Sequence, residues 1–199
     1  MTRRDAVENV LRLLRMDPAF SNWARGYDTL DAAWVACAEP SWMLLLLQTL
    51  GYSDGRALRL FAAACATRVR HLAGGGASDR AIEVAAKVAA SEADPEDLAP
   101  AYRAARDHGR TLLGSPDFSE AMAAAAAACA ASVRERPFDA GLDASREARR
   151  AVAWDLAGGR APSEEAAWQA AELRRLVGAD VGPVLERARA QTRGKLALA

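Results

Sequence analysis

Residues 34–72 read WVACAEPSWMLLLLQTLGYSDGRALRLFAAACATRVRHL. The stretch holds the densest run of large apolar side chains in the chain, together with two of its three cysteines. Pro40 and Gly51 divide it into helical segments, because proline cannot continue a helix and glycine often ends one. Residues 42–50 are apolar on nearly every side, which is typical of a helix surrounded by others. The stretch therefore predicts a pair of central helices around which a small helical protein packs.

Similar start and stop signals divide the rest of the chain. Serine is a good N-cap, and we interpret Ser53, Ser78 and Ser163 as residues that open helices. Asp94 followed by Pro95 predicts another helix start, with Gly109 as its end. The remaining expected helices span residues 3–16, 29–38, 42–50 and 142–157. Two more are expected, one that starts at Ser115-Pro116 and includes the alanine run 123–131, and a short one from Pro183. The alanine run suits a close-packed inner helix.

Composition indicates one globular, helical protein. The chain has 199 residues, of which 51% are hydrophobic and 26% charged, enough for one sizeable core. Alanine makes up roughly a quarter of it, which favours helix because alanine loses no side-chain entropy there. No segment shows the two-residue alternation of a strand. We expect an all-α fold, either a single compact bundle or an irregular array of about eight or nine helices.

We divide this fold into three parts. Residues 1–30 are expected to form an N-terminal helix and a docking arm, residues 31–178 the helical core domain, and residues 179–199 a short C-terminal helix and tail. The sequence leaves open whether the arm docks on its own core or on another molecule.

Charge and cysteine content exclude several classes of protein. Basic and acidic residues balance at 26 each, which argues against a dedicated nucleic-acid binder. The three cysteines show no CxxC spacing and are typical of a reducing compartment. The N-terminus lacks the apolar region of a signal peptide, and the run Trp42–Leu47 is too short to span a bilayer. We expect a cytoplasmic protein that does not enter a membrane.

The pattern Trp34, Cys37, Pro40, Met43-Leu44, followed by Leu58 to Ala62 with Cys65 and by Ala81 to Ala85, resembles a family of uncharacterised alanine-rich helical proteins abundant in planctomycetes and other large-genome bacteria. Residues 169–176 resemble the terminal helix of that family, whose Asn-Pro-Phe ending is absent here. The resemblance implies a core over about residues 31–178. It implies no activity, because the family has none assigned.

No catalytic constellation is visible. The two histidines, His71 and His108, lie in no metal-binding spacing, and no motif places either beside a cysteine. Phosphate-binding loops, dinucleotide fingerprints and GxSxG elbows are absent. Acidic clusters such as Glu164-Glu165 lie at helix starts, where they favour the helix dipole. We therefore assign no catalytic residue, no metal ligand and no cofactor.

Two sets of residues are candidates for binding. A basic set near the third helix of the opening stretch either forms an anion or partner site or is consumed by internal salt bridges; it consists of Arg56, Arg59, Arg70 and Arg80. An aromatic set either docks on a partner or packs internally; it consists of Trp23, Tyr27 and Trp34. Arg146, Arg149 and Arg150 are interpreted as an ordinary solvated helix face.

Three functional hypotheses follow. The first is a non-catalytic protein-interaction or scaffold module that binds a protein partner or itself. The second is a regulatory helical domain that senses a small anion or nucleotide through the arginines near Arg59. The third is an enzyme of unrecognised type, which would show itself as a polar cavity holding His71 or His108 with several carboxylates.

Overall fold

A computed structural model describes residue 11 and residues 17–114, 118–132, 137–155, 157–178 and 181–184. Within these ranges the chain is helical and contains no strand, so the expected all-α fold is confirmed. The helix expected over 3–16 and most of the one expected from Pro183 lie outside the described residues, as does the Ser115-Pro116 start. No helix in the described part of the chain is both long and apolar enough to cross a bilayer.

The helices follow one another with short connections. Their bounds are α2 Pro18–Ala24, α3 Leu30–Ala36, α4 Pro40–Thr49, α5 Gly55–Arg68, the 3₁₀ turn η1 Arg70–Leu72, α6 Ala77–Ala89, the 3₁₀ turn η2 Pro95–Asp97, α7 Leu98–Leu112, α8 Phe118–Ala130, α9 Pro137–Trp154 and α10 Pro162–Val177.

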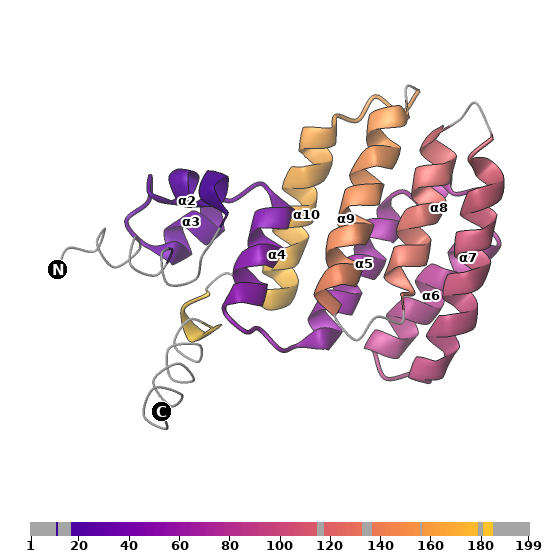
Figure 1. The fold of residues 1–199 in the computed structure, drawn as a ribbon, viewed down its shortest axis with the longest axis horizontal. Coiled ribbons are helices and arrows are strands. Elements are labelled where there is room, and N and C mark those ends of the chain that lie inside the picture. Colours follow the sequence, from indigo (N-terminus) through magenta and orange to yellow (C-terminus); the bar gives the residue numbers. More distant parts are fainter. Residues whose placement is uncertain are drawn as a thin grey trace.

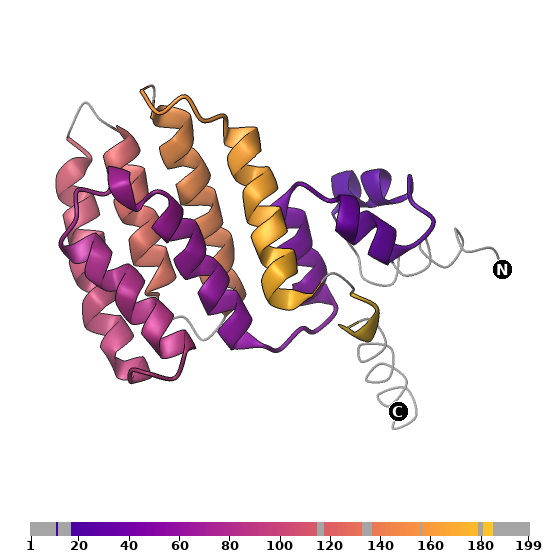
Figure 2. The ribbon, with the colours of Figure 1, turned by 180° about the vertical axis from the view of Figure 1, so that it is seen from behind.

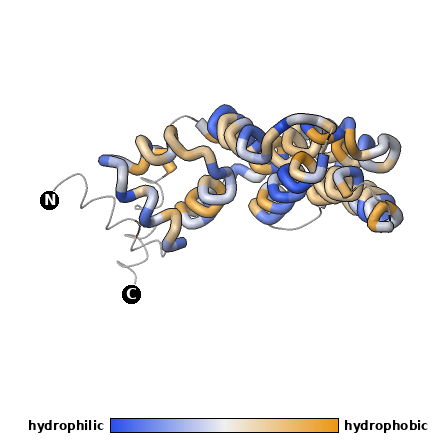
Figure 3. The backbone as a smooth tube through the Cα atoms, turned by 90° about the horizontal axis from the view of Figure 1, so that it is seen from above, coloured by the Kyte–Doolittle hydropathy of each residue, from blue (hydrophilic) through white to orange (hydrophobic). Residues whose placement is uncertain are grey.

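The long helices form two layers. Helices α4, α9, α8 and α7 lie side by side in one layer, and α10, α5 and α6 in the other (Figures 1 and 2). Helix α8 packs on α7 and α9 within its own layer and on α5 and α6 behind it. Seen from above, the helices carry both hydrophilic and hydrophobic segments (Figure 3), as amphipathic helices that pack between two layers do. Helices α2 and α3 lie at the α4 end.

The expected pairing of α4 with α5 is wrong. Helix α5 is central, since it packs on α6, α8, α9 and α10. Helix α4 lies at the edge of the other layer and packs on α9 and α10 rather than on α5. Both helices are apolar enough to be buried, but apolarity does not choose the partner. Helices α9 and α10, which come later in the sequence, supply the contacts that were expected between α4 and α5.

The opening stretch nevertheless supplies most of the bulk of the core. Fully buried large side chains from it include Trp34, Met43, Leu46, Leu47, Leu50, Leu58 and Phe61. The expected close-packed helix at the alanine run is also found, because seven alanines of α8 are buried among its neighbours. Small side chains let α8 approach the surrounding helices closely, so the large residues of α4 and α5 provide most of the buried apolar area.

Several helix ends differ from expectation. Asp54, not Ser53, caps α5, since its carboxylate accepts from the N–H groups of Arg56 and Ala57 at 3.0 and 3.1 Å. Ser78 lies inside the first turn of α6, with its hydroxyl buried and no partner among the described residues. In α10 the N-cap position belongs to Ala161, ahead of Pro162. The starts expected at Ser53 and Ser163 are therefore set by Asp54 in α5 and by Pro162 in α10.

Two helices are longer than predicted. Helix α7 continues through Gly109 to Leu112, because this glycine lies against α8, where an added Cβ would sit 3.5 Å from that of Ala124. Helix α9 begins at Pro137 rather than near residue 142. A proline is compatible with the first turn of a helix, where its missing N–H would have had no intrahelical acceptor. Both residues were read as breaks and instead belong to helices.

Contacts between distant parts of the chain hold α3 to the end of α10. The Trp34 indole N–H donates to the Gly178 carbonyl at 3.1 Å. Arg174 donates to the carbonyls of Trp34 and Cys37 at 3.1 and 2.7 Å, which satisfies the C-terminal end of α3. The backbone N–H of Val181 donates to Asp31 at 3.0 Å. The last helix of the array therefore positions the first segments of the chain.

Candidate functional site

The structure does not bring the four candidate arginines together. Arg56 and Arg59 lie near the start of α5, whereas Arg70 follows its end and Arg80 is on α6. The eleven residues from Arg59 to Arg70 correspond to about 16 Å along a helix. Arg59 donates to the Ser132 carbonyl at 3.2 Å, and burial lowers the pKa of its guanidinium. Arg70 pairs with Asp79 at 2.5 Å.

The candidate aromatic residues pack on the protein's own core. Trp34 is 1% exposed, so it presents no surface to a partner in this structure. Trp23 lies with its ring centroid 4.8 Å from that of Tyr27 and 5.7 Å from that of Trp42 on α4. Phe20 is buried beside the same two tryptophans. The arm that carries these residues therefore docks on its own chain.

A buried acid ties three helices together. Glu165 is 0% exposed and accepts from Arg68 at 2.7 Å and from Arg160 at 3.0 Å. Its second oxygen accepts from Gln169, whose side chain also bonds Ser145 on α9. The guanidinium of Arg68 lies 4.3 Å from the ring centroid of Trp168. Glu165 was read as an acid favouring a helix dipole; it is the centre of a satisfied buried network, which explains why its charge is tolerated.

The two histidines form no catalytic arrangement with neighbouring acids. His71 lines a hollow of about 520 Å³ whose carboxylate, Asp79, is paired with Arg70. His108 has its Nε2 3.3 Å from the carbonyl of Ala73. Within the described ranges no three His, Cys, Asp or Glu side chains are placed to hold a metal ion.

The surface that sequence reasoning missed runs along α8. Phe118, Met122, Ala125 and Cys129 follow helical spacing of three and four residues, and all four reach the surface, whereas most other residues of α8 are buried. We call these four residues the α8 stripe. Helix α8 itself lies between α7 and α9, with α5 and α6 behind it (Figure 1). The stripe was not predicted, because a run that is almost all alanine shows no difference between an exposed and a buried helix face in the sequence.

Apolar side chains of neighbouring helices enlarge the α8 stripe. Trp154, at the end of α9, is 56% exposed and has its ring centroid 5.5 Å from that of Phe118. On the other side, the groove between α7 and α8 forms a hollow of about 210 Å³. Leu113 is exposed there, and Tyr102 lines the same hollow. Apolar side chains at the surface therefore lie on α7, along α8 and at the end of α9.

Arginines flank the stripe on both sides. Arg106 and Arg110 line the α7 side and share one acid, Asp107, at 3.0 and 3.7 Å. Hydrogen bonding to Asp107 raises the pKa of the Arg106 guanidinium. Arg146 on α9 is close enough to Cys129 to interact with it electrostatically. The α7 side thus carries more positive than negative charge.

On α9 the arginines reach the solvent further than the acids that pair with them, which are Glu147 and, for Arg146, also the partly exposed Asp143. Arg146 and Arg150 bond the same carboxylate, that of Glu147, at 3.1 and 3.2 Å. Their side chains are 55% and 56% exposed, whereas that of Glu147 is 9% exposed. Hydrogen bonding to Glu147 raises the pKa of Arg146. The sequence alone presents a balanced Arg-Glu face here, but the fold buries the acid and leaves the guanidinium groups outside.

The comparisons with known proteins identify no relative. No family model matches the chain, and no curated protein or solved structure was found to be similar to it. The resemblance of the opening stretch to a bacterial family therefore stays a prediction.

Proposed function

We propose that this protein is a non-catalytic helical interaction module that uses the α8 stripe as its docking surface. The occupant is an amphipathic helix of a protein partner, with acidic residues on both sides of its apolar face. The observation that carries the proposal is the stripe itself, an apolar face of α8 that the rest of the fold leaves at the surface.

The dimensions of the stripe suit a helical ligand. Phe118 and Cys129 are eleven residues apart, which corresponds to about 16 Å, or three helical turns. Helix-in-groove recognition uses anchors spaced three, four and seven residues apart, and a docked helix of about 12 residues covers such a length. The hollow between α7 and α8 is lined by residues from several turns of both helices, so a ligand helix can lie roughly parallel to them.

Energy and charge both favour this occupant. The Phe118–Trp154 pair is a suitable anchor, because exposed aromatic side chains dominate the energetics of many protein interfaces. The arginines on α7 and α9 would attract acidic residues and repel basic ones, which adds to the association rate and to selectivity. Such a ligand complements both the apolar stripe and its charged borders.

We place the protein in the cytoplasm as part of this proposal. Cys37 and Cys65 are buried as thiols, which suits a reducing compartment. Burial raises the pKa of both thiols, so they stay protonated and unreactive at neutral pH.

A designed peptide tests the docking surface. The probe is a fluorescent helical peptide of about 14 residues, with leucines at the spacing of the stripe and glutamates beside them. Fluorescence anisotropy at low ionic strength should show binding. Met122→Glu should weaken that binding at least tenfold, because it places a charge in the centre of the apolar contact.

Two controls separate docking from general stickiness. Val35→Glu changes another exposed apolar residue, far from α8, and should leave the affinity unchanged. A peptide with lysines in place of the glutamates should bind more weakly than the acidic one. Equal binding of the acidic peptide to Met122→Glu would overturn the proposal. A molar mass that falls with this variant in light scattering would make the occupant a second copy of the chain.

A further inference from the structure

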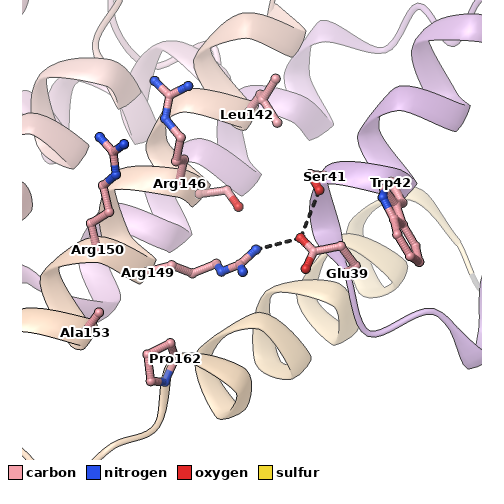
Figure 4. Close-up of a pocket in the computed structure, with 10 residues that line it drawn as sticks. Glu39, Ser41, Trp42, Leu142, Arg146, Arg149, Arg150, Ala153 and Pro162 are labelled. Carbon is pink, nitrogen blue, oxygen red and sulfur yellow. Dashed lines mark hydrogen bonds and ion pairs between the residues drawn. The ribbon is translucent and has the colours of Figure 1, made fainter. Parts of the chain in front are cut away.

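A second surface feature lies on the other side of α9. A groove of about 590 Å³ is enclosed between α9, the start of α4 and the start of α10. Arg146, Arg149 and Arg150 line it from α9, and Glu39, Ser41 and Trp42 from the α4 side. Figure 4 shows Arg149 reaching across the groove towards Glu39.

Glu39 has an unusual role for its position. It precedes α4, where a side chain commonly caps the first N–H groups, but the Glu39 side chain makes no capping hydrogen bond. Its Oε1 instead accepts from Arg149 at 2.6 Å and from the Ser41 hydroxyl at 2.9 Å. The Glu39 carboxylate therefore bonds an arginine of α9 and leaves the first N–H groups of its own helix, α4, without a side-chain cap.

The ion pair between them can be exchanged for another. Both side chains are about one-third exposed, at 33% for Arg149 and 31% for Glu39. Ion pairs that reach solvent contribute little to stability, so an incoming anion can replace the Glu39 carboxylate without unfolding the groove. Ser41 would remain beside the exchanged group as a hydroxyl donor.

The other two arginines pair with acids of their own helix, and their guanidinium groups point away from the Arg149–Glu39 pair (Figure 4). Glu147 bonds Arg146 and Arg150 while it is itself nearly buried, which orients both guanidinium groups. A guanidinium has five N–H donors, and the ion pairs found within the described ranges use only some of them. Arginine donors in this arrangement match the paired oxygens of carboxylate and phosphate groups.

Apart from Ser145, the remaining lining of the groove is apolar. Trp42, Leu142 and Pro162 line it together with the arginines, and Leu142 is an exposed apolar residue. The volume falls in the range of about 300 to 1,000 Å³ typical of small-molecule sites. The groove thus combines an anion-binding side with an apolar side.

We propose that this groove binds a small organic anion, a carboxylate or phosphate monoester that carries an apolar or aromatic group. The anionic group takes the place of Glu39 on Arg149, and the apolar group lies against Trp42 and Leu142. Glu39 acts as an internal competitor that sets the affinity. This inference does not depend on the α8 stripe, since neither Arg149 nor Glu39 belongs to it.

Two substitutions that break the same ion pair test the proposal. Glu39→Gln removes the competitor, and its amide oxygen can still accept from Ser41, so binding should tighten at least threefold. Arg149→Gln removes the ligand's partner, so binding should weaken at least tenfold, as expected when a hydrogen bond to a charged group is lost. The probe is phenyl phosphate, titrated by isothermal calorimetry into the full-length chain, with benzoate as the carboxylate arm.

Opposite effects of the two substitutions on affinity distinguish a binding role of the ion pair from a purely structural one. Any loosening between α9 and α4 is common to the two variants, whereas the affinity should move in opposite directions. Arg175→Gln removes an exposed, paired arginine of α10 and should leave the affinity unchanged. Inorganic phosphate should bind more weakly than phenyl phosphate, because it lacks the apolar group. The proposal is overturned if Glu39→Gln binds neither probe, or if both variants change the affinity in the same direction.

Discussion

Two aromatic groups in this protein have similar internal contacts and opposite environments. In the arm group, the rings of Phe20, Trp23 and Trp42 have centroids 5.7 to 5.9 Å apart, and that of Tyr27 lies 4.8 Å from Trp23. Phe118 on α8 and Trp154 on α9 lie 5.5 Å apart. Phe20 is buried and the other rings of the arm group are partly buried against the core, whereas the second pair is exposed. Ring contacts alone therefore do not distinguish a core from a docking surface. The exposed fraction of the aromatic side chains distinguishes them.

The largest expected effect separates these two groups. Phe20→Ala should lower the free energy of unfolding by about 3–5 kcal/mol, because it removes a buried ring and leaves a cavity. Trp154→Ala should change it by less than about 1 kcal/mol, since its ring is largely in solvent already. Urea unfolding followed by circular dichroism measures both. Equal losses would mean that the exposed pair is part of the core.

The same comparison can be made with two adjacent acids. Glu165→Ala should cost about 2–4 kcal/mol, because it leaves Arg68 and Arg160 without their carboxylate and breaks the link to α9. Glu164→Ala, one residue earlier and exposed, should cost less than about 1 kcal/mol. Thermal unfolding of the two variants in parallel gives the difference. A loss at Glu164 as large as that at Glu165 would refute the role of the buried network.

Burial should also be visible in the dependence of stability on pH. Desolvation by burial, with Glu165 and Glu172 nearby, raises the pKa of Cys65 well above its ordinary value. Above a pH of about 8.5 the unfolded chain loses this proton while the folded chain keeps it, so stability falls as pH rises, by about 1.4 kcal/mol per unit. Cys65→Ala should show a shallower fall in urea unfolding between pH 8.5 and 10. Parallel curves for the two proteins would contradict this assignment.

The smallest effects concern two glycines. Gly109→Ala should stabilise the protein by about 0.5–1 kcal/mol, because alanine favours helix and its Cβ would meet ordinary contacts on α8. Gly74→Ala should destabilise it, since Gly74 has a φ of 69° and a Cβ there would lie 2.6 Å from Glu120 Oε1. Differential scanning calorimetry resolves both shifts. Stabilisation by both substitutions would show that the loop at Gly74 relaxes freely.

Local signals in the sequence predicted where the helices lie better than they predicted which helices pack against each other. Gly51 has a positive φ where a break was expected. The all-round apolar pattern of residues 42–50 predicted a buried helix, and α4 has several buried side chains. That pattern could not pair α4 with α9 and α10, because an all-round apolar helix can pack on any other. Gly109 was misleading as a helix end, because a close contact with α8 accommodates this glycine inside α7.

The candidate surfaces were harder to predict than the fold. Conspicuous arginines near Arg59 are spread along α5 and beyond it, whereas the arginines of α9 line a groove only because α4 and α10 stand beside it. The stripe on α8 was hidden in a run of alanines. Glu39 and Arg149 are 110 residues apart, and nothing local indicates that they meet.

The sequence by itself determined that the described part of the chain is helical, roughly where its helices lie, and that residues 34–72 carry the densest run of large apolar side chains. These properties depend on backbone propensity, on capping and on the periodicity of apolar residues, all of which act over a few neighbouring positions. Only the tertiary structure decided which aromatic groups are covered, which acids are buried between arginines, and which arginines share a groove. Those properties depend on distant segments that meet in space, because burial belongs to the assembled layers and not to any single helix.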